Sequence, residues 1–541
     1  MNQKTIVINL TRFGDLLQTQ PVFTALKARG RETALVCLEN FASAAKLMRD
    51  VDAVFALPGA ALLSQLDDDW RRGLGTFCDW AGNDLASFGA DQVVNLTSTL
   101  PGRLLARYLA PCEVVGYALD EFGFADNTSP WAAFLVASSR NRGCSPFNLV
   151  DLFHHVAGYG QEPGAQSDGP AHPVYRLREP DTAATAAVRG VLTAEGPADA
   201  PGYIAIQLGA SADFRRWPVA HFARLAELVH ERTGLCPVLL GSGDEAPLAE
   251  RFRAACRVPS ASLVGRTSLV ELAAALGLVR MLVTNDTGTM HLAAGLGVPV
   301  CAVFLATAQP WDTGPYSSDA LCIEPDMPCH PCGFGKTCPT GFSCRHAVQP
   351  EAVAAFVHAR LDRGRWELES GASRPEGIRV WEMRPGADGF MGLVSRSGHE
   401  DADRTVWVRQ QRHFYCRFLD GEPISEAGAP RFAGDSSVAE TVRAELEQAE
   451  RLFHLLGEQA VALSKVPLPP LKKRFMASFE RLTGLLCESR YLSVLGDMWR
   501  EQAHGLGDDF SRMPALAERY QRLCGQWCRH LAPLGMQLET D

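Results

Sequence analysis

The sequence predicts an α/β protein made of two doubly wound domains and a third, smaller module. Three observations lead to this prediction. Apolar strand-like runs alternate with helix-like runs through roughly the first 180 residues, the alternation restarts at residue 203, and the pattern changes after about residue 370. Alternation of this kind is typical of mostly parallel sheets with helices on both faces.

The first alternating region predicts four strands and two clear helices. Gly30 is expected to end the first helix, because glycine adopts the left-handed conformation common at helix ends. The strands are expected at 5–10, 33–40, 53–58 and 91–97, and the helices at 16–30 and 41–50.

The second alternating region repeats this order after the Pro/Gly/Asp-rich segment 160–173, which is taken as a linker. Pro218 and Gly234 bracket a predicted helix, since proline favours the first helical turn and glycine the position after the last. The other strands are expected at 203–209, 236–241, 281–286 and 298–304, with helices at 245–256, 268–279 and after 286.

The third region combines short apolar runs with long amphipathic ones. The runs 378–383, 390–396 and 405–419 predict a small β-meander, and 437–464, 471–499 and 513–534 predict amphipathic helices. The predicted domains are therefore 1–175, 176–368 with a cysteine-rich loop at 322–344, and 369–541, the last without a recognisable chemical motif.

Composition limits the classes of function. The 541 residues are 46% hydrophobic and 21% charged, as in a typical globular protein, and the net charge of −10 argues against a general nucleic-acid partner. No run is long enough to span a bilayer. The N-terminal apolar run is expected to be a first strand and not a signal peptide, so a cytoplasmic location is expected.

Ligands of open α/β sheets bind beyond the carboxyl ends of the strands. In "LTRFGDLLQTQP", Asp15 follows Gly14 at such an end, just before a helix. Two interpretations are open. Asp15 is a helix N-cap, or it is a general base held at the mouth of a cleft between the domains.

The segments that directly follow two other predicted strands suit a nucleotide diphosphate. "QLGASADFRRWPVAHF" supplies Arg215 and Arg216 after a small-residue loop, and arginine can grip a diphosphate through paired hydrogen bonds. The alternative is a solvated basic pair. In "LLGSGDEAPL", Asp244 is expected to accept hydrogen bonds from ribose or a base edge, or else to cap the next helix.

The fourth exit lies in "VTNDTGTMHLAAGLGVPVCAVF", residues 283–304. Thr287 and Gly288 open a helix whose first amides form a ready anion site. Asp286 is expected to accept from sugar hydroxyls. His291, on the same helix face as Thr287, is expected to donate to a phosphate or else to be a satisfied core histidine. The chain lacks the glycine fingerprints of dinucleotide-binding and P-loop proteins.

These four stretches, in this order, resemble the lipopolysaccharide heptosyltransferase family, glycosyltransferase family nine. The resemblance covers roughly residues 4–360. It implies a GT-B fold with two Rossmann-like domains facing a cleft. It also implies inverting transfer of heptose or a related sugar from a nucleotide diphosphate sugar, ADP-heptose above all, to a lipopolysaccharide core acceptor, with no metal required. The partners are then the donor and a lipid-linked saccharide at the inner-membrane face.

The resemblance also implies roles for single residues. Asp15 matches the catalytic base, which favours that interpretation over the cap, and Arg215 stands where the family usually has a lysine, beside the leaving diphosphate. The expected donor contacts, in chain order, are Ser211, Arg216, Asp244, Thr267, Asp286, Thr287, Gly288 and His291.

Four of the sixteen cysteines form a separate cluster, "CHPCGFGKTCPTGFSC". Their spacing suits a structural zinc ion or an iron–sulfur cluster. The alternative is a set of reduced thiols that stabilise a loop, or disulfides formed on isolation. The residues concerned are Cys329, Cys332, Cys338 and Cys344.

Two alternative functions remain open. A related enzyme could use another donor or another acceptor, and the arginine at position 215 and the third module leave room for it. A non-catalytic binding protein of the same fold is the other alternative. It is disfavoured because Asp15 and the cations are present.

Overall fold

The computed structural model describes residues 3–109, 111, 113–141, 145–159, 172–197, 200–369, 371, 373–507 and 509–532. The predicted linker at 160–173 therefore lies almost wholly outside the described residues. The chain divides into two compact units, and each is described by itself. The first unit comprises 1–115 and 147–398, and the second comprises 116–146 and 399–541.

The first sheet of the first unit is parallel, with strands in the order β3-β2-β1-β4. Its strands contain the β-branched residues Ile6 and Val36, which pack with Phe88 and Leu105 in one core. All four predicted strands are present, as β1 (Lys4–Ile8), β2 (Glu32–Leu38), β3 (Ala53–Leu57) and β4 (Gln92–Asn95).

The helix predicted at 16–30 is present but broken. A turn at Gln18–Thr19 splits it, and Gly30, with φ of 73°, follows its end as predicted. The segment predicted as a helix at 41–50 is largely a 3₁₀ segment, Glu39–Leu47. The helices of this half are α1 (Phe13–Leu17), α2 (Gln20–Ala28), α3 (Gly59–Asp68), α4 (Trp70–Trp80), α5 (Leu100–Tyr108) and α7 (Leu149–Val156).

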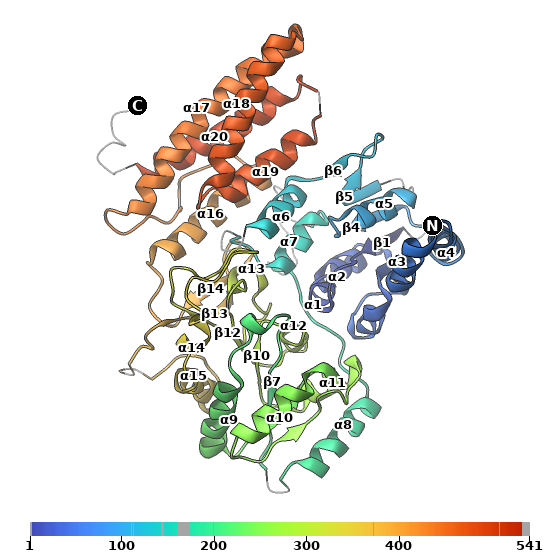
Figure 1. Ribbon diagram of the computed structural model, residues 1–541, viewed down its shortest axis with the longest axis vertical. Helices are drawn as coiled ribbons and strands as arrows, with labels where there is room; N and C mark the ends of the chain where they lie inside the picture. The colour runs from blue at the N-terminus through green and yellow to red at the C-terminus, as the bar shows by residue number, and fades with distance from the viewer. Residues whose placement is uncertain are drawn as a thin grey trace. The chain divides into compact units, whose positions relative to one another are not determined.

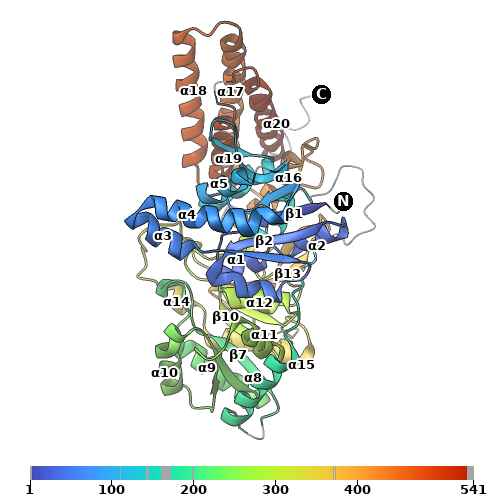
Figure 2. The same ribbon diagram turned by 90° about the vertical axis from the view of Figure 1, so that its right-hand side faces the viewer.

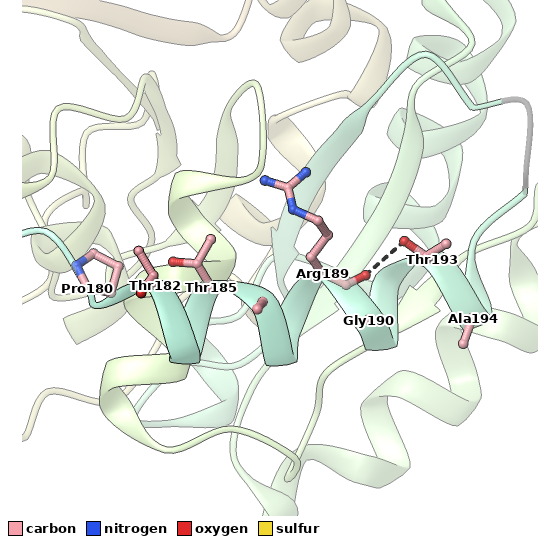
Figure 3. Close-up of a pocket in the computed structure, with 8 residues that line it drawn as sticks. Pro180, Thr182, Thr185, Arg189, Gly190, Thr193 and Ala194 are labelled. Carbon is pink, nitrogen blue, oxygen red and sulfur yellow. Dashed lines mark hydrogen bonds between the residues drawn. The ribbon is translucent and has the colours of Figure 1, made fainter.

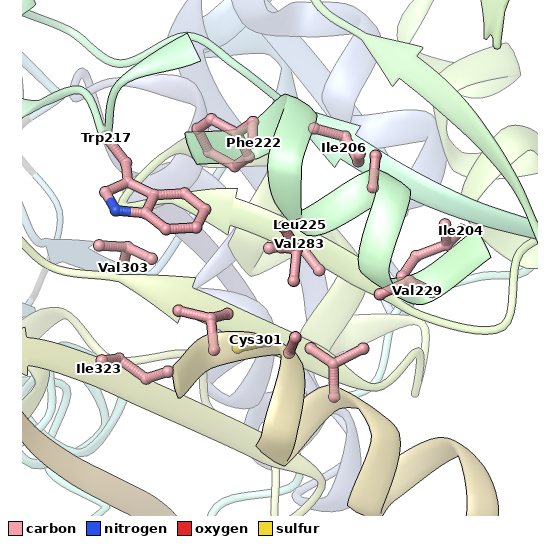
Figure 4. Close-up of a cluster of buried hydrophobic side chains, with 14 of the residues drawn as sticks. Ile204, Ile206, Trp217, Phe222, Leu225, Val229, Val283, Cys301, Val303 and Ile323 are labelled. Carbon is pink, nitrogen blue, oxygen red and sulfur yellow. The ribbon is translucent and has the colours of Figure 1, made fainter. Parts of the chain in front are cut away.

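The second sheet has eight strands in the order β14-β13-β12-β11-β10-β7-β8-β9, and β7 to β12 are parallel. Figure 4 shows Trp217 and Phe222 packed over Ile206, Val283 and Val303 in its core. The parallel strands are β7 (Tyr203–Gln207), β8 (Cys236–Leu240), β9 (Ala261–Ser262), β10 (Leu282–Asn285), β11 (Val300–Val303) and β12 (Ala320–Pro325).

The helices of this half follow the predicted order. Pro218 is the N-cap of α9, and Gly234, with φ of 70°, is its C-cap. The elements are α8 (Thr182–Glu195), α9 (Val219–Thr233), α10 (Ala246–Ala255), α11 (Leu269–Gly277), α12 (Gly288–Gly295), α13 (Pro310–Thr313), α14 (Cys344–Ala347) and α15 (Pro350–Arg363).

The predicted β-meander is wrong. β13 (Ile378–Pro385) and β14 (Met391–Ser395) pair antiparallel beside β12 and so extend the second sheet, while 405–419 is helical, within α16 (Asp403–Leu419). That segment is rich in β-branched and aromatic residues, which suggested a strand. Its buried positions nevertheless include Val408, Arg412, Tyr415 and Leu419, which repeat at helical spacing.

The second unit joins the helical C-terminal region to residues 116–146, which the sequence assigned to the first domain (Figures 1 and 2). Asn141 Nδ2 donates to the Asp497 carboxylate at 2.6 Å, and Trp131 Nε1 donates to the Asp420 carboxylate at 2.7 Å. Its elements are the end of β5 (Glu113–Leu119), β6 (Ala125–Asn127), α6 (Pro130–Arg140), α16, α17 (Ser437–Lys465), α18 (Pro469–Glu488), α19 (Ser493–His504) and α20 (Met513–Leu531).

None of the helices in the described ranges is both long and apolar enough to cross a bilayer.

Candidate functional site

The starts of α1 and α12, which follow the first strand of one sheet and a central strand of the other, meet within the first unit. Two glycines make this close approach possible. A Cβ atom at Gly14 would lie 3.0 Å from the His291 ring and 3.2 Å from the Gly288 Cα, and one at Gly288 would lie 2.5 Å from the Phe13 ring. The segments around the predicted base and the predicted anion seat are therefore adjacent.

Asp15 lies in the first turn of α1 and is half-buried. The N-cap of this helix is Arg12, so the alternative in which Asp15 caps the helix is wrong. A carboxylate in the first turn still interacts favourably with the helix dipole. Its role as a base stays a prediction.

Arg215 is held by two side chains that the sequence also selected. Its Nη1 donates to the Ser211 hydroxyl at 2.9 Å, and its Nη2 forms an ion pair with the Asp286 carboxylate. The charged ends are largely shielded, with 16% and 12% of the Arg215 and Asp286 side chains exposed. Among the described residues, Arg215 Nε is buried without a hydrogen-bond partner. Each Nη atom has a second N–H, so the guanidinium has more donors than these two contacts use.

In the structure the Asp286 carboxylate pairs with Arg215, and its expected acceptance of hydrogen bonds from sugar hydroxyls stays a prediction. β10 ends at Asn285, which places Asp286 within reach of the loop after β7. Asp286 therefore orients the guanidinium of Arg215.

Asn285 is a residue that the sequence argument missed. It is fully buried. Its Nδ2 donates to the carbonyls of Leu208 and Gly209, both at 3.0 Å, and its Oδ1 accepts from Trp217 N–H at 2.8 Å. One amide thus fixes both ends of the loop that carries Ser211, Arg215 and Arg216. The sequence feature that could have identified Asn285 is its place at the end of an apolar strand. An amide side chain buried there needs hydrogen-bond partners.

His291 lies one turn into α12 and is 5% exposed. Burial lowers the pKa of its ring to about 4, so the ring is neutral at pH 7. Its carbonyl accepts from Tyr175 OH at 2.9 Å, but among the described residues its Nδ1 is buried without a partner. The alternative interpretation, a core histidine whose ring nitrogens are hydrogen-bonded within the protein, is therefore wrong.

The N-terminus of α12 has the properties of an anion seat. Thr287 is the N-cap and makes no side-chain capping bond to the helix amides, and Gly288 is the first helical residue. The first amides of a helix lack intrahelical partners and carry partial positive charge. The seat is thus bordered by the neutral His291 ring.

The exits of β8 and β9 share this edge of the second sheet. Glu245 accepts from Gln207 Nε2 and from Ser242 N–H, both at 2.9 Å, and leaves no room for a side chain at Gly209. The neighbouring Asp244 is exposed, so the carboxylate at the surface of this loop is that of Asp244.

Thr267 is half-buried in the turn before α11. The glycine of this turn, Gly265, has φ of 68° and packs against Gly243 of the β8 exit, where a Cβ would lie 2.9 Å from the Gly243 Cα. The two predicted nucleoside contacts, Asp244 and Thr267, are thus on neighbouring loops.

Arg216 is turned toward its own loop. Its guanidinium contacts the Asp213 carboxylate at 3.4 Å and the Ala210 carbonyl at 3.5 Å. The structure therefore distinguishes the two arginines, because Arg215 is held beside α12 through Asp286 and Arg216 folds back.

The four cysteines of the predicted metal site are free thiols. Burial first, and then the other three thiols, raise the pKa of Cys332, whereas hydrogen bonds from Thr340 and Phe342 lower the pKa of Cys338. Within the described ranges, no three His, Cys, Asp or Glu side chains form a group that could hold a metal ion. The four thiols as placed therefore do not fit the predicted zinc or iron–sulfur ligand set.

The cysteine-rich loop is instead tied to the loop that carries Arg215. Arg345 Nε donates to the Arg216 carbonyl at 2.9 Å, and Arg345 Nη1 pairs with Asp213 at 3.2 Å. The rings of Phe342 and Phe214 stack with centroids 6.0 Å apart. These contacts brace the loop in addition to those of Asn285.

A surface hollow of about 680 Å³ lies elsewhere, along α8 (Figure 3). It contains none of the predicted site residues. Since α8 and Pro180, which precedes the N-cap Asp181, supply all of the lining among the described residues, it is a shallow surface feature. Its lining residues are Pro180, Thr182, Thr185, Ala186, Arg189, Gly190, Thr193 and Ala194.

Comparison with known proteins agrees with this geometry. Residues 149–342 match glycosyltransferase family 9 (heptosyltransferase). Lipopolysaccharide heptosyltransferase 1 of Pseudomonas aeruginosa is 33% identical over 195 residues, which are 35% of this chain and 54% of that protein. Lipopolysaccharide heptosyltransferase 2 of Salmonella typhimurium is 32% identical over 156 residues, 27% of this chain and 43% of that protein. The matched regions thus span about half the length of these relatives.

The fold is shared more widely. The crystal structure of the glycosyl transferase family 9 protein from Veillonella parvula superposes with a TM-score of 0.52 at 19% identity, over 65% of this chain and 96% of that one. This similarity confirms the predicted GT-B type of fold. Residues 149–342, from α7 into the cysteine-rich loop, thus match glycosyltransferase family 9 (heptosyltransferase), and the chain has a fold similar to that of a member of this family.

Proposed function

We propose that this protein transfers heptose from ADP-heptose to a lipopolysaccharide core acceptor, with inversion and without a catalytic metal ion. The observation that carries the proposal is the meeting of α1 and α12, since it brings the segment of Asp15 beside the anion seat at Thr287 and Gly288. The family match and the names of the relatives support the heptosyl donor and the lipopolysaccharide acceptor.

The chemical step needs a base on one face of the sugar and cationic groups on the other. Asp15 takes the proton of the acceptor hydroxyl as that oxygen attacks the anomeric carbon. The bond from the anomeric carbon to the diphosphate oxygen breaks, and ADP leaves with the electron pair. Attack from the face opposite the diphosphate inverts the anomeric configuration.

Three groups stabilise the charge that develops on the leaving diphosphate. Arg215 supplies a guanidinium oriented by Asp286, and the first amides of α12 supply fixed dipoles. His291 acts as a neutral N–H donor, because its pKa of about 4 keeps the ring uncharged at neutral pH. Preorganised groups of this kind need little rearrangement during the reaction.

The remaining donor contacts follow the same edge of the sheet. Ser211 contacts the diphosphate from the loop after β7. Arg216 joins it once its guanidinium turns away from Asp213 and the Ala210 carbonyl, which it contacts in this structure. Asp244 and Thr267 contact the nucleoside from neighbouring loops, and the exposure of Asp244 leaves its carboxylate accessible to a ribose.

The acceptor and the location follow from the same proposal. A lipid-linked saccharide is presented at the cytoplasmic face of the inner membrane, so the protein works in the cytoplasm and at that face. The proposed chemical step uses no metal ion. A zinc ion or iron–sulfur cluster at the four cysteines is suggested by their spacing alone, and their placement does not fit it. Metal analysis of anaerobically purified protein tests the metal site: stoichiometric zinc or iron would support it, and metal-free protein would rule it out.

A donor screen tests the function. Wild type and Asp15→Ala are incubated with ADP-, GDP- and UDP-sugars, followed by thermal shift and by transfer to a lipid A–core acceptor. We expect ADP-heptose to stabilise both proteins and only wild type to transfer the sugar. Stabilisation by a different nucleotide sugar, or transfer to another acceptor, would instead support a related enzyme. If no nucleotide sugar binds, the protein is a non-catalytic relative.

A further inference from the structure

The turn between α17 and α18 combines exposed apolar and basic side chains. The two helices form an antiparallel pair in the second unit (Figures 1 and 2), and residues 464–476 at the turn are here called the hairpin tip. Every residue from 464 to 470 is exposed. The apolar members are Val466, Leu468 and Met476, exposed by 50%, 51% and 41%, and the basic ones are Lys465, Lys472, Lys473 and Arg474.

The charge of the tip contrasts with that of the whole chain. The protein carries a net charge of −10, yet no acidic residue occurs between Glu458 and Glu480. The neighbouring loop contributes Phe510, whose ring lies 5.8 Å from Lys472 Nζ, and Asp509, an exposed carboxylate that accepts from Ser511 N–H at 3.0 Å. Among the described residues of the tip and of this loop, Asp509 is the acidic one, against four basic side chains.

The exposed apolar residues are not needed to close the bundle. Phe475 and Phe479 of α18 are buried, and Phe475 packs against Phe510 with ring centroids 5.3 Å apart. These rings complete the bundle core behind the tip. Leu468 and Val466 lie beyond them, in a proline-rich turn, where their side chains face solvent.

The arrangement on α18 places both kinds of side chain together. Leu468 is the N-cap of the helix, and Lys472 and Met476 follow at intervals of four residues, so the three lie along one face. Long basic side chains beside apolar ones suit a membrane interface, because the apolar groups enter the headgroup region while the ammonium groups reach the phosphates.

We propose that the hairpin tip binds the surface of a membrane rich in anionic lipids. Charge complementarity favours this partner, since each lysine or arginine near such a surface contributes about 1 kcal/mol, or roughly a five-fold gain in affinity. A nucleic acid is a poorer match. Residues 464–476, all of which the structure describes, expose no aromatic ring on which bases could stack.

This inference extends the proposed function, which brings the acceptor to a membrane, by naming the element that reaches it. The test contains no nucleotide sugar and no acceptor saccharide. Failure of membrane binding and failure of sugar transfer are therefore observed separately.

Co-sedimentation of the full chain with vesicles tests the proposal. Vesicles of phosphatidylcholine alone are compared with vesicles of equal parts phosphatidylcholine and phosphatidylglycerol. We expect binding to the anionic vesicles that weakens as salt is raised. Leu468→Trp supplies a second readout, because its fluorescence should shift to the blue and be quenched by brominated lipid when the tip enters the headgroup region.

Matched variants separate the effect of the tip side chains on binding from the effect of the net charge of the protein. Lys473→Glu combined with Arg474→Glu should weaken binding at least tenfold, and Val466→Ser combined with Leu468→Ser should weaken it about fivefold or more. The control, Arg451→Glu combined with Arg481→Glu, makes the same change in net charge at exposed positions of the same two helices and should leave binding unchanged. Circular dichroism verifies that each variant is folded.

Three results would overturn the proposal. The first is that wild type fails to bind anionic vesicles. The second is that the control variant weakens binding as much as the tip variant. The third is that the serine variant binds like wild type and duplex DNA competes with the vesicles. The last result would assign the tip to a nucleic acid.

Discussion

Arg215 and Asp286 form a shielded ion pair that joins the exits of two adjacent strands, β7 and β10. The pair satisfies two requirements at once. A guanidinium aimed at a diphosphate must be oriented before the ligand arrives, and a partly buried cation needs a counter-charge. Asp286 meets both, and the second N–H of each Nη atom remains as a donor for the ligand.

Replacement of Arg215 should affect the transition state more than donor binding. Arg215→Ala removes the cation beside the leaving diphosphate, and we expect kcat to fall by about 10² to 10³. Arg215→Lys should recover part of that loss, because lysine restores the charge but not the paired hydrogen bonds. Steady-state kinetics with ADP-heptose measures both. Equal kcat in wild type and alanine variant would contradict the assigned role.

Asp15→Asn should abolish most of the transfer while donor binding survives. The amide has nearly the same shape but cannot take a proton, so kcat should fall by about 10² to 10⁴. Isothermal titration with ADP should give the same affinity for both proteins. A variant that has lost ADP affinity as well as activity would indicate a structural role for Asp15.

Gly288→Ala tests the close approach of α1 and α12. The new methyl group would lie 2.5 Å from the Phe13 ring, so the ring or one of the two helices must shift. We expect a loss of kcat/KM of about tenfold or more, partly restored by adding Phe13→Leu. Gly277→Ala, on α11, is the matched control, because a Cβ there meets no atom within 4 Å. If the two alanine variants behave alike, the helix contact has no role in activity.

His291 should make stability depend on pH. Its pKa is about 4 in the folded protein, against an ordinary value of 6.5. Between these values the unfolded chain binds more protons, so the free energy of unfolding rises with pH across that window. Wild type should lose about 2 kcal/mol more than His291→Asn when the pH falls from 7 to 5. Denaturant titrations at both pH values measure the free energy of unfolding. Equal losses in wild type and in His291→Asn would rule out a buried neutral ring.

Arg345→Ala tests the brace between the cysteine-rich loop and the loop of Arg215. Loss of the bonds to Asp213 and to the Arg216 carbonyl should loosen the arginine loop, and we expect kcat/KM to fall about tenfold. Arg224→Ala, which removes ion pairs of an exposed arginine with Glu351 and Glu227, is the control and should change little. The idea fails if both variants keep full activity.

Some features of this protein were determined by its sequence alone. Alternating apolar runs define both parallel sheets, because a buried parallel strand must be apolar and a helix must return the chain to the same edge. The order of motifs then placed Ser211, Arg215, Asp286 and Gly288 at one edge of one sheet, since parallel strands end together.

Other features depended on tertiary contacts. The ion pair of Arg215 with Asp286, the anchoring amide of Asn285 and the contact of Gly14 with Gly288 each join residues far apart in the chain. The helical state of 405–419 is similar: its β-branched and aromatic residues favour a strand locally, and burial against the bundle makes it a helix. Local propensity is weak beside the free energy of burying a large apolar face, so only the folded chain decided these points.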